Sequence, residues 1–257
     1  MGNIYEKGFS SPAEIERLKK LDFPLEVSEK VIGDPNDKSL VDIGSGPNPT
    51  LGQWVEKGGG EYVALDTNPP FLGELKKAKL EEVVRADCKD LPLEDESVDV
   101  SHLRFVLMHF PALSDRIRII EEALRVAKEK AVFLEYDWND FEALGLIGEI
   151  KNIAIELLGK VSDPYYGAKL ETEVKAVLEK IKDKDYEVSS EKFSRPKLPY
   201  TEELEKMIGG IISLSQKIDP SKTERLEQIQ EEIKSVSEEA LAFVPPSIKA
   251  VIIEKTK

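Results

Sequence analysis

The sequence predicts an α/β protein whose centre is a doubly wound, mostly parallel sheet. Three observations support this prediction. Short apolar runs recur through the first half of the chain, several of them end in glycine or aspartate, and helical patterns fill gaps between them. Strands that alternate with helices make parallel βαβ units, and such units form a sheet with helices on both faces. The 257 residues suit one large domain.

Five strands are expected in the first half of the chain, because each is a short run of mostly apolar residues bounded by turn residues. They are Ser39–Ile43, Tyr62–Asp66, Glu82–Asp87, Val98–Leu103 and Ala131–Tyr136. Two helices, Ser11–Leu21 and Leu25–Ile32, are expected before the first strand. The clearest helix between strands is Ser114–Lys128, where Ile117, Ile120, Leu124 and Ala127 fall on one face.

The alternation of strands and helices ends after the fifth strand. Helices are expected over Phe141–Leu158 and Leu170–Ile181, followed by a strand over Tyr186–Phe193 and a last strand over Ala250–Glu254. The stretch Thr201–Ala242 is helical and highly charged, and it separates two strands that would otherwise pair. We therefore expect it to lie outside the sheet, either as a solvated amphipathic cap or as a mobile lid over the active site.

We divide the single domain into five segments. The N-terminal helices occupy 1–37 and a cofactor-binding core occupies 38–137. Helices and the sixth strand follow over 138–199, a helical lid insert over 200–246, and the last strand over 247–257.

The net charge of −14 argues against nucleic acid as a partner. Lysine and arginine are interleaved with glutamate and aspartate, so no basic patch is available to release counterions from a phosphate backbone. The partner is expected to be a small molecule. The chain itself is expected to be a monomer or a homodimer.

Composition also bears on the compartment. Cys88 is the single cysteine and the chain has two histidines, so an intrachain disulfide is impossible and no metal site is expected. No apolar run is long enough to span a bilayer, and the N-terminus lacks a signal-peptide pattern. We expect a cytoplasmic protein. Abundant lysine and glutamate with few asparagine, glutamine and cysteine residues indicate a thermophilic source.

The strongest motif is the turn after the first strand, Val41–Pro47. Gly44 and Gly46 let the backbone pass close to a ligand, and ligands of doubly wound sheets lie beyond the carboxyl ends of the strands. A plain strand-to-loop turn is the alternative. A third glycine to serve a pyrophosphate is absent, and Pro47 and Pro49 remove amide donors. The loop favours a ligand without a phosphate.

Acidic residues end the next two strands. Asp66 can accept both ribose hydroxyls of an adenosine, or it can cap the turn that follows it. Asp87, followed by Cys88, can accept the adenine amino group, or it can act as a cap. Asp99, at the start of the fourth strand, is expected to be structural.

Together these residues resemble the class I S-adenosylmethionine-dependent methyltransferases, and among them the small-molecule branch of ubiquinone and menaquinone biosynthesis. The resemblance covers roughly residues 38–137. The matching stretches are Val41–Gly46, Val63–Asn68, Ala86–Asp99 and Leu103–Phe110. It implies a seven-stranded sheet in which only the last strand is antiparallel, with Val251–Glu254 paired to Tyr186–Phe193.

The resemblance also implies S-adenosylmethionine as cofactor and a role for each matching residue. Asp42, Gly44, Ser45 and Gly46 would hold the methionine part, Asp66 with Thr67 the ribose, Asp87 and Cys88 the adenine, and Arg104 the methionine end or the acceptor. The chain departs from the family at Asn48, where a further glycine is common. It also departs at Arg104, where small polar residues are common.

Methyl transfer from a sulfonium is an in-line displacement that mainly requires alignment of donor and acceptor. A general base is needed only if the acceptor loses a proton. His109 is the candidate catalytic base because it follows the fourth strand, and a packing histidine is the alternative. His102, within the strand, is expected to be packed. Four more side chains could reach the pocket: Tyr5, Tyr136, Asp137 and Tyr166.

Other functions stay open at this point. One is a non-catalytic protein that binds S-adenosylmethionine. Another is a nicotinamide-dependent oxidoreductase, which would be expected to carry a third glycine after Gly46. An RNA methyltransferase is disfavoured by the acidic composition and by the absence of an Asn-Pro-Pro-Tyr type motif past the fourth strand.

Overall fold

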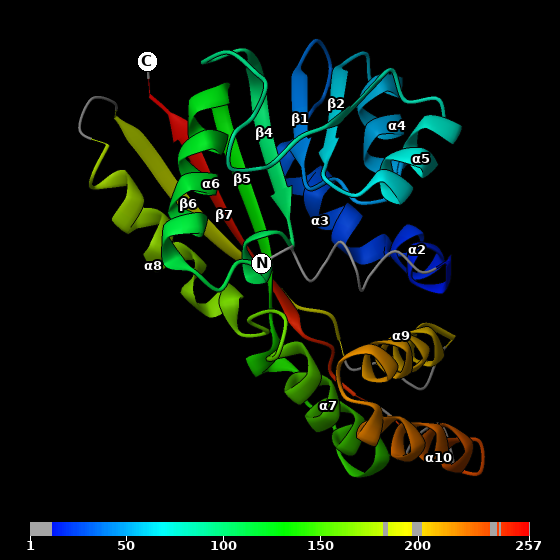
Figure 1. Ribbon diagram of the computed structural model, residues 1–257. Coiled ribbons are helices and arrows are strands. Elements are labelled where there is room, and N and C mark those ends of the chain that lie inside the picture. The colour runs from blue at the N-terminus through cyan, green and yellow to red at the C-terminus, as the bar shows by residue number, and fades with distance from the viewer. Residues whose placement is uncertain (1–11, 182–184, 197–201, 237–240, 242, 257) are drawn as a thin grey trace.

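A seven-stranded sheet forms the centre of the computed structural model (Figure 1). The structure describes residues 12–181, 185–196, 202–236, 241 and 243–256. The strands lie in the order β3-β2-β1-β4-β5-β7-β6. Their bounds are β1 Ser39–Ile43, β2 Glu61–Asp66, β3 Glu82–Arg85, β4 Val98–Arg104, β5 Ala127–Asp137, β6 Tyr186–Phe193 and β7 Ser247–Lys255.

The first five strands are parallel, and β7 runs against both of its neighbours. Val251 pairs with Phe133 of β5 on one side and with Ser190 of β6 on the other. The predicted doubly wound sheet, with an antiparallel last strand paired to Tyr186–Phe193, is therefore confirmed.

Helices cover both faces of the sheet. On one face lie α3 (Asp22–Ile32), α4 (Thr50–Lys57) and α5 (Pro69–Lys77), and on the other α6 (Leu113–Val126) and α8 (Tyr166–Leu178). Each face has its own buried apolar cluster. The apolar run Ala131–Leu134 in β5 follows from this, since a parallel strand buried on both faces has few polar positions.

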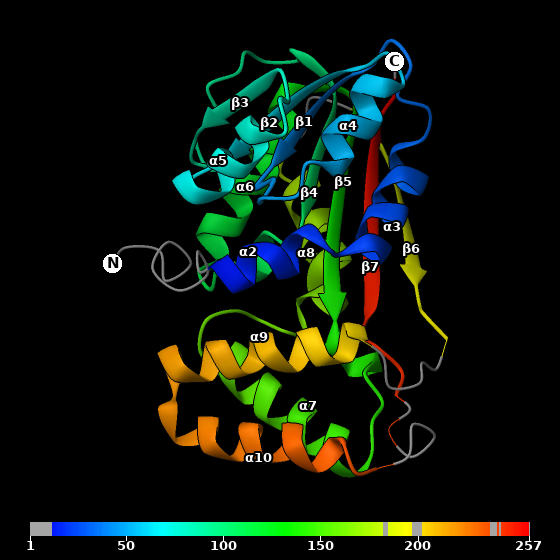
Figure 2. The same ribbon diagram turned by 90° about the vertical axis from the view of Figure 1, so that its right-hand side faces the viewer.

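A third apolar cluster lies outside the sheet. It is formed by α7 (Gly145–Leu158), α9 (Glu202–Ile218) and α10 (Thr223–Ile233), which pack on one another beyond the end of β5 (Figure 2). We call these three helices the cap. Helix α2 (Pro12–Lys19) lies between α9 and the sheet in both views. No helix within the described ranges is long and apolar enough to cross a membrane.

Most differences from the sequence prediction concern where elements begin. Helix α7 begins at Gly145 rather than Phe141, and Trp138–Asp140 forms a separate 3-10 turn in which Asp137 accepts the amide of Asn139. Strand β5 begins at Ala127 rather than Ala131, since β4 pairs with its first residue. The predicted helical stretch Thr201–Ala242 is divided by a 3-10 turn at Pro220–Lys222, and parts of it lie outside the described residues.

Candidate cofactor and acceptor site

A cavity of about 1160 Å³ opens at the carboxyl ends of β1, β2 and β4. The residue sets that the sequence predicted for the cofactor and for catalysis meet there, apart from Asp42. Lining it are Gly44, Ser45, Gly46, Asp66, Thr67, Asp87, Cys88, Arg104 and His109. Small-molecule sites usually occupy roughly 300–1,000 Å³, so this cavity has room for a cofactor together with a second molecule.

The glycine turn takes its shape from contacts with two neighbouring strands. Gly44 has φ +71° and Gly46 has φ +66°, a conformation that L side chains rarely adopt. The amides of Gly44 and Ser45 both donate to the Leu65 carbonyl, at 2.8 and 3.0 Å. A Cβ on Gly44 would lie 2.6 Å from Cγ2 of Val106, so glycine is also needed for the close approach of the loop after β4.

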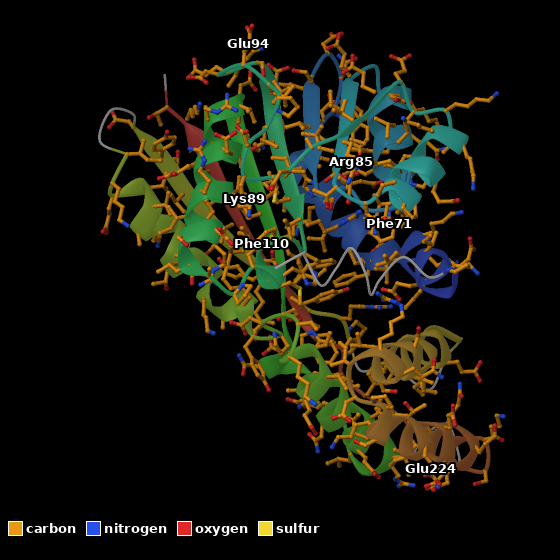
Figure 3. All side chains as sticks on the ribbon, viewed as in Figure 1. Phe71, Arg85, Lys89, Glu94, Phe110 and Glu224 are labelled. Carbon is orange, nitrogen blue, oxygen red and sulfur yellow. The ribbon has the colours of Figure 1, made fainter. Side chains whose placement is uncertain are left out.

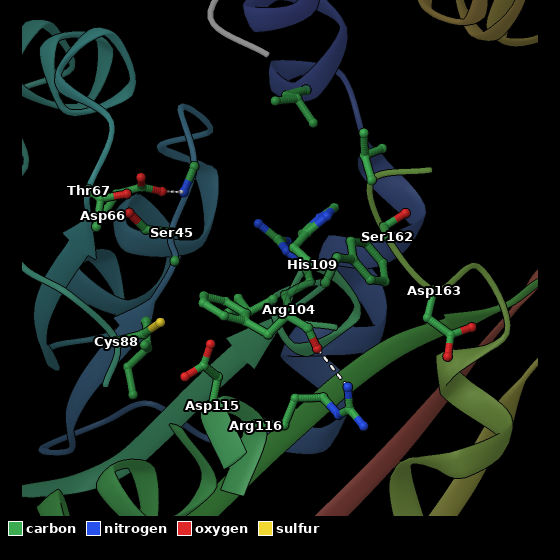
Figure 4. Close-up of a pocket in the computed structure, with 18 of the residues that line it drawn as sticks. Ser45, Asp66, Thr67, Cys88, Arg104, His109, Asp115, Arg116, Ser162 and Asp163 are labelled. Carbon is green, nitrogen blue, oxygen red and sulfur yellow. Dashed lines mark hydrogen bonds between the residues drawn. The ribbon is translucent and has the colours of Figure 1, made fainter. Parts of the chain in front are cut away.

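Asp66 connects the end of β2 to the glycine turn. Its Oδ2 accepts the amide of Gly46 at 3.0 Å, and its Oδ1 accepts the amide of Asn68 at 2.8 Å (Figure 4). Burial raises the pKa of Asp66 above its usual value. Asp66 is thus both a turn residue and a wall of the cavity, and each oxygen keeps lone-pair capacity for another donor.

Asp87 and Cys88 form the edge of the cavity after β3. The Asp87 carboxylate is exposed and accepts the amide of Lys89 at 2.9 Å. Burial raises the pKa of the Cys88 thiol to about 12, so the thiol is neutral and contributes mainly an apolar surface. Cys88 and Asp66 lie on the same side of the cavity, opposite Asp163 (Figure 4).

Two buried polar atoms in the cavity wall make no hydrogen bond with any described residue. They are Oγ of Ser45, whose side chain is 4% exposed, and Nη1 of Arg104 at the end of β4. Buried polar groups in proteins are normally hydrogen-bonded, so these two atoms indicate a ligand. A guanidinium and a hydroxyl beside a glycine turn suit the carboxylate and amine of an amino acid.

Asp42 is the predicted cofactor residue that the structure does not bring to the cavity. Its carboxylate is buried below the glycine turn, where it accepts the Tyr62 hydroxyl at 2.7 Å and lies 2.8 Å from Nδ1 of His102. The sequence could not show this, because successive side chains of a buried strand point to opposite faces and both faces of β1 are covered.

His102 is packed, as expected, and completes a buried network. Its Nε2 lies 3.0 Å from Oγ of Ser28, which donates to the Pro24 carbonyl. The serine oxygen must therefore accept from Nε2–H, which leaves Nδ1 of His102 facing Asp42. Burial acts to raise the pKa of Asp42, but His102, Arg104 and the Tyr62 hydroxyl together hold it below its usual value.

The turn after β4, Leu107–His109, brings His109 to the middle of the cavity (Figure 4). Burial lowers the pKa of His109 well below its usual value, so the ring is neutral at pH 7. The turn rests on Glu135 at the end of β5, whose Oε1 accepts the amide of Leu107 at 2.7 Å. Burial raises the pKa of Glu135 to about 8.

The far wall of the cavity was not recognised from the sequence. It is the loop after α7, 159–164, together with Ile155. The amide of Asp163 donates to the Met108 carbonyl at 2.8 Å, which ties this loop to the turn that carries His109. Leu18 and Leu21, at the end of α2, close another side. The end of α2 contributes apolar side chains, whereas the loop 159–164 contributes both apolar and polar ones, among them Ser162 and Asp163.

The remaining candidates from the sequence do not line the cavity. Tyr136 stacks on Phe105 with ring centroids 3.9 Å apart, and Asp137 caps the 3-10 turn. Tyr166 is fully buried and donates to Glu173 at 2.8 Å. Asp99 accepts the amide and hydroxyl of Ser39 at 2.7 Å, which confirms its structural role. Tyr5 lies outside the described residues.

Comparisons with solved structures reproduce this architecture. YcgJ of Bacillus subtilis matches 92% of this chain and 99% of its own, with TM-score 0.55 and 14% identity. A chain from Anabaena variabilis, described as a methyltransferase from an antibiotic biosynthesis pathway, matches 91% and 96%, with TM-score 0.65 and 14% identity. At such identities the likeness shows the fold alone. A sheet of this order, with its cavity at the carboxyl edge, defines the Rossmann-like methyltransferase fold.

A family model matches part of the sequence. Residues 41–134, which include most of β1, all of β2 to β4 and most of β5, match the model described as a methyltransferase domain. This domain makes the chain an S-adenosylmethionine-dependent methyltransferase, with S-adenosylmethionine as its cofactor. No curated protein matches the sequence closely enough to count as a relative. The narrower resemblance to the ubiquinone and menaquinone enzymes stays a prediction.

Proposed function

We propose that the protein transfers the methyl group of S-adenosylmethionine to a small, largely apolar acceptor whose reactive atom is uncharged. The observation that carries this proposal is the division of the cavity into two unlike halves. One half contains Ser45 and Arg104 with unused buried polar atoms. In the other half the described charged side chains already pair with one another.

The first half suits the cofactor along its whole length. Arg104 and Ser45 would bind the methionine carboxylate and amine, the carboxylate of Asp66 the ribose hydroxyls, and Asp87 the adenine amino group. Cys88 would offer its apolar surface to the adenine. Asp42 would act from beneath, by holding β1 and the glycine turn in place. When bound, the cofactor supplies a methyl group on a positively charged sulfur.

The acceptor half has little charge left for a ligand. Arg116 donates to both oxygens of Glu173 at 2.8 Å and to the Phe110 carbonyl at 2.6 Å. Asp163 binds Lys169 at 2.6 Å and the amide of Tyr165 at 3.0 Å. A charged acceptor that bound Arg116 would have to displace Glu173, and this largely buried carboxylate would then lack its partner.

Apolar side chains provide most of the remaining contact surface in that half: Leu18, Leu21, Phe110, Ile155, Val161 and Tyr165. At its rim, Nζ of Lys89 lies 5.7 Å from the Phe110 ring centroid and 3.8 Å from Asp115 (Figure 3). An acceptor with an apolar body and one polar atom would bury its body here without leaving a charge unpaired.

His109 lies between the two halves and is neutral. A neutral imidazole can accept a hydrogen bond from a hydroxyl or amine and thereby orient its lone pair. With so low a pKa it is a weak base, so its principal contribution would be alignment of the acceptor atom rather than removal of its proton. A role of His109 in catalysis, through alignment of the acceptor atom, stays a prediction.

Calorimetric titration with S-adenosylmethionine tests the cofactor half. We expect Asp66→Asn and Arg104→Gln each to weaken binding by about 1–3 kcal/mol, because each removes a charge-assisted hydrogen bond. Asp95→Asn and Arg118→Gln are the matched controls, since both lie on the exposed surface. Unchanged affinity in Asp66→Asn and Arg104→Gln would contradict the assignment.

A screen of methyl acceptors tests the other half. Transfer of radiolabelled methyl from the cofactor to apolar phenols and thiols is compared with transfer to amino acids and to charged amines. We expect turnover with the first group. Turnover confined to the charged group would show that the ion pairs of the acceptor half rearrange, and it would contradict the proposed acceptor class.

A further inference from the structure

Asn48 is the point at which this chain departs from the glycine expected by family resemblance, and its side chain has an unusual set of contacts. Its Oδ1 accepts the amide of Thr50 at 3.0 Å, at the start of α4. Its Nδ2 donates to the carbonyls of Leu18 and Lys19, at 3.4 and 3.2 Å. One carboxamide, 5% exposed, thus joins the start of α4 to the end of α2.

The backbone around Asn48 connects these contacts to the cofactor. Gly46, two residues earlier, donates to Asp66 and lines the cavity. Asn48 stands between Pro47 and Pro49, and proline rings restrict both their own φ and the residue before them. A change in the position of the glycine turn must therefore move the Asn48 side chain with it.

Helix α2, whose end Asn48 contacts, also contacts the cap. It packs against α9, and at the crossing a Cβ on Gly210 would lie 2.9 Å from Cδ of Arg17. Glycine at this position lets the two helices approach closely. The same Cβ would lie 3.3 Å from Nε of Arg17, whose head group is held by Glu14 at 2.8 Å.

We propose that Asn48 is a positioning residue that couples the cofactor loop to the cap through α2. The inference rests on the proposed cofactor site. When the glycine turn is held by the cofactor, Asn48 holds the end of α2, Leu18 and Leu21 keep their place in the cavity wall, and α2 keeps its contact with α9. The cofactor thereby organises the acceptor half before the acceptor enters.

Hydrogen–deuterium exchange with S-adenosylhomocysteine as the probe tests the coupling without an acceptor. In the unaltered chain we expect the probe to slow exchange in the glycine turn, in α2 and in Glu202–Ile218 of α9. The slowing in α9 should be about fivefold, as a net stabilisation of about 1 kcal/mol by one side chain would produce.

Asn48→Asp separates the two contacts of the side chain. Aspartate still accepts the Thr50 amide, but it has no donor for the Leu18 and Lys19 carbonyls. We expect the probe to bind Asn48→Asp within about twofold of the unaltered affinity. It should still protect the glycine turn and no longer protect α9. Asn36→Asp, in an exposed turn, is the matched control and should behave like the unaltered chain.

Gly210→Val breaks the same link from the cap side and leaves Asn48 intact. It should likewise lose probe-induced protection of α9 and keep affinity for the probe. If Asn48 had only a structural role, the probe would still slow exchange in α9 of Asn48→Asp as much as in the unaltered chain. That result would overturn the proposal. So would protection that stops at the glycine turn in the unaltered chain. Failure of the unaltered chain to bind the probe would instead contradict the cofactor site itself, and the inference would fall with it.

Discussion

Glu135 allows a direct test of how burial affects a carboxyl group beside the cavity. Glutamine differs from glutamate only in carrying an amide NH2 in place of one carboxylate oxygen. The Glu135 side chain is 1% exposed, and Oε1 accepts the Leu107 amide at 2.7 Å. Oε2 is buried and makes no hydrogen bond with the described residues. Glu135→Gln keeps the accepting oxygen and the shape of the side chain, but it cannot titrate.

Burial raises the pKa of Glu135 to about 8 in the folded protein, against the usual 4.5, while the backbone amides around Leu107 act in the opposite direction. Between these two values the folded state holds a proton that the unfolded state has lost. The stability that this carboxyl contributes is therefore complete below about pH 4.5 and is lost as the pH rises through 8.

The expected change in the free energy of unfolding follows from the difference in bound protons between the folded and unfolded states. Stability changes by about 1.4 kcal/mol per pH unit for each proton that the folded state holds in excess. From pH 6 to pH 9 the native protein should lose on the order of 3 kcal/mol through Glu135 alone. Glu135→Gln should not show this loss, although its unpartnered amide should cost about 1–3 kcal/mol at low pH.

Urea unfolding at several values between pH 6 and pH 9, followed by tryptophan fluorescence, measures the difference between the two proteins. Titrations of other groups cancel in that difference. Glu94→Gln, an exposed residue on the opposite end of the molecule from the cap, controls for the loss of one charge (Figure 3). Parallel curves for the native protein and Glu135→Gln would refute the claim that the buried carboxyl is protonated at neutral pH.

Two further substitutions test the framework around the cavity. Gly44→Ala should destabilise the fold by about 1–3 kcal/mol, because the φ of +71° and the Val106 methyl group both oppose a Cβ; a melting temperature equal to that of the native protein would contradict this. His102→Leu should cost about 3–5 kcal/mol, since it removes the partner of Oδ1 of the buried Asp42 and leaves the carboxylate with the Tyr62 hydroxyl. Adding Asp42→Asn to His102→Leu should recover part of that loss in urea unfolding, and a further loss instead would show that the pair is not coupled.

Much of the cavity wall at the strand tips could be predicted from the sequence, because the residues that form it are local to each strand end. A strand that ends in Gly44–Gly46 and another that ends in Asp66 place their side chains at one edge of a parallel sheet, whatever the details of packing. Side-chain direction could not be predicted in the same way. Asp42 belongs to the same motif, yet it faces α3 and His102, because the register of β1 against two neighbours decides which face it takes.

Residues that act across long separations carried no signal in the sequence. Glu135 is one glutamate among many until β5 lies beside β4 and the Leu107 amide meets it. Asn48 looked like a departure from a glycine pattern, and only the fold places the end of α2 beside it. The loop 159–164 closes the acceptor half through backbone and apolar contacts, which have no residue signature.

The sequence by itself determined the fold class, the order of the strands along the chain and the residues at their tips, since period and turn residues act over a few positions. Tertiary structure alone decided which buried acid faces the ligand, what encloses the acceptor and how the cap joins the core. Those outcomes depend on contacts between residues tens of positions apart, and such contacts exist only after the sheet has assembled.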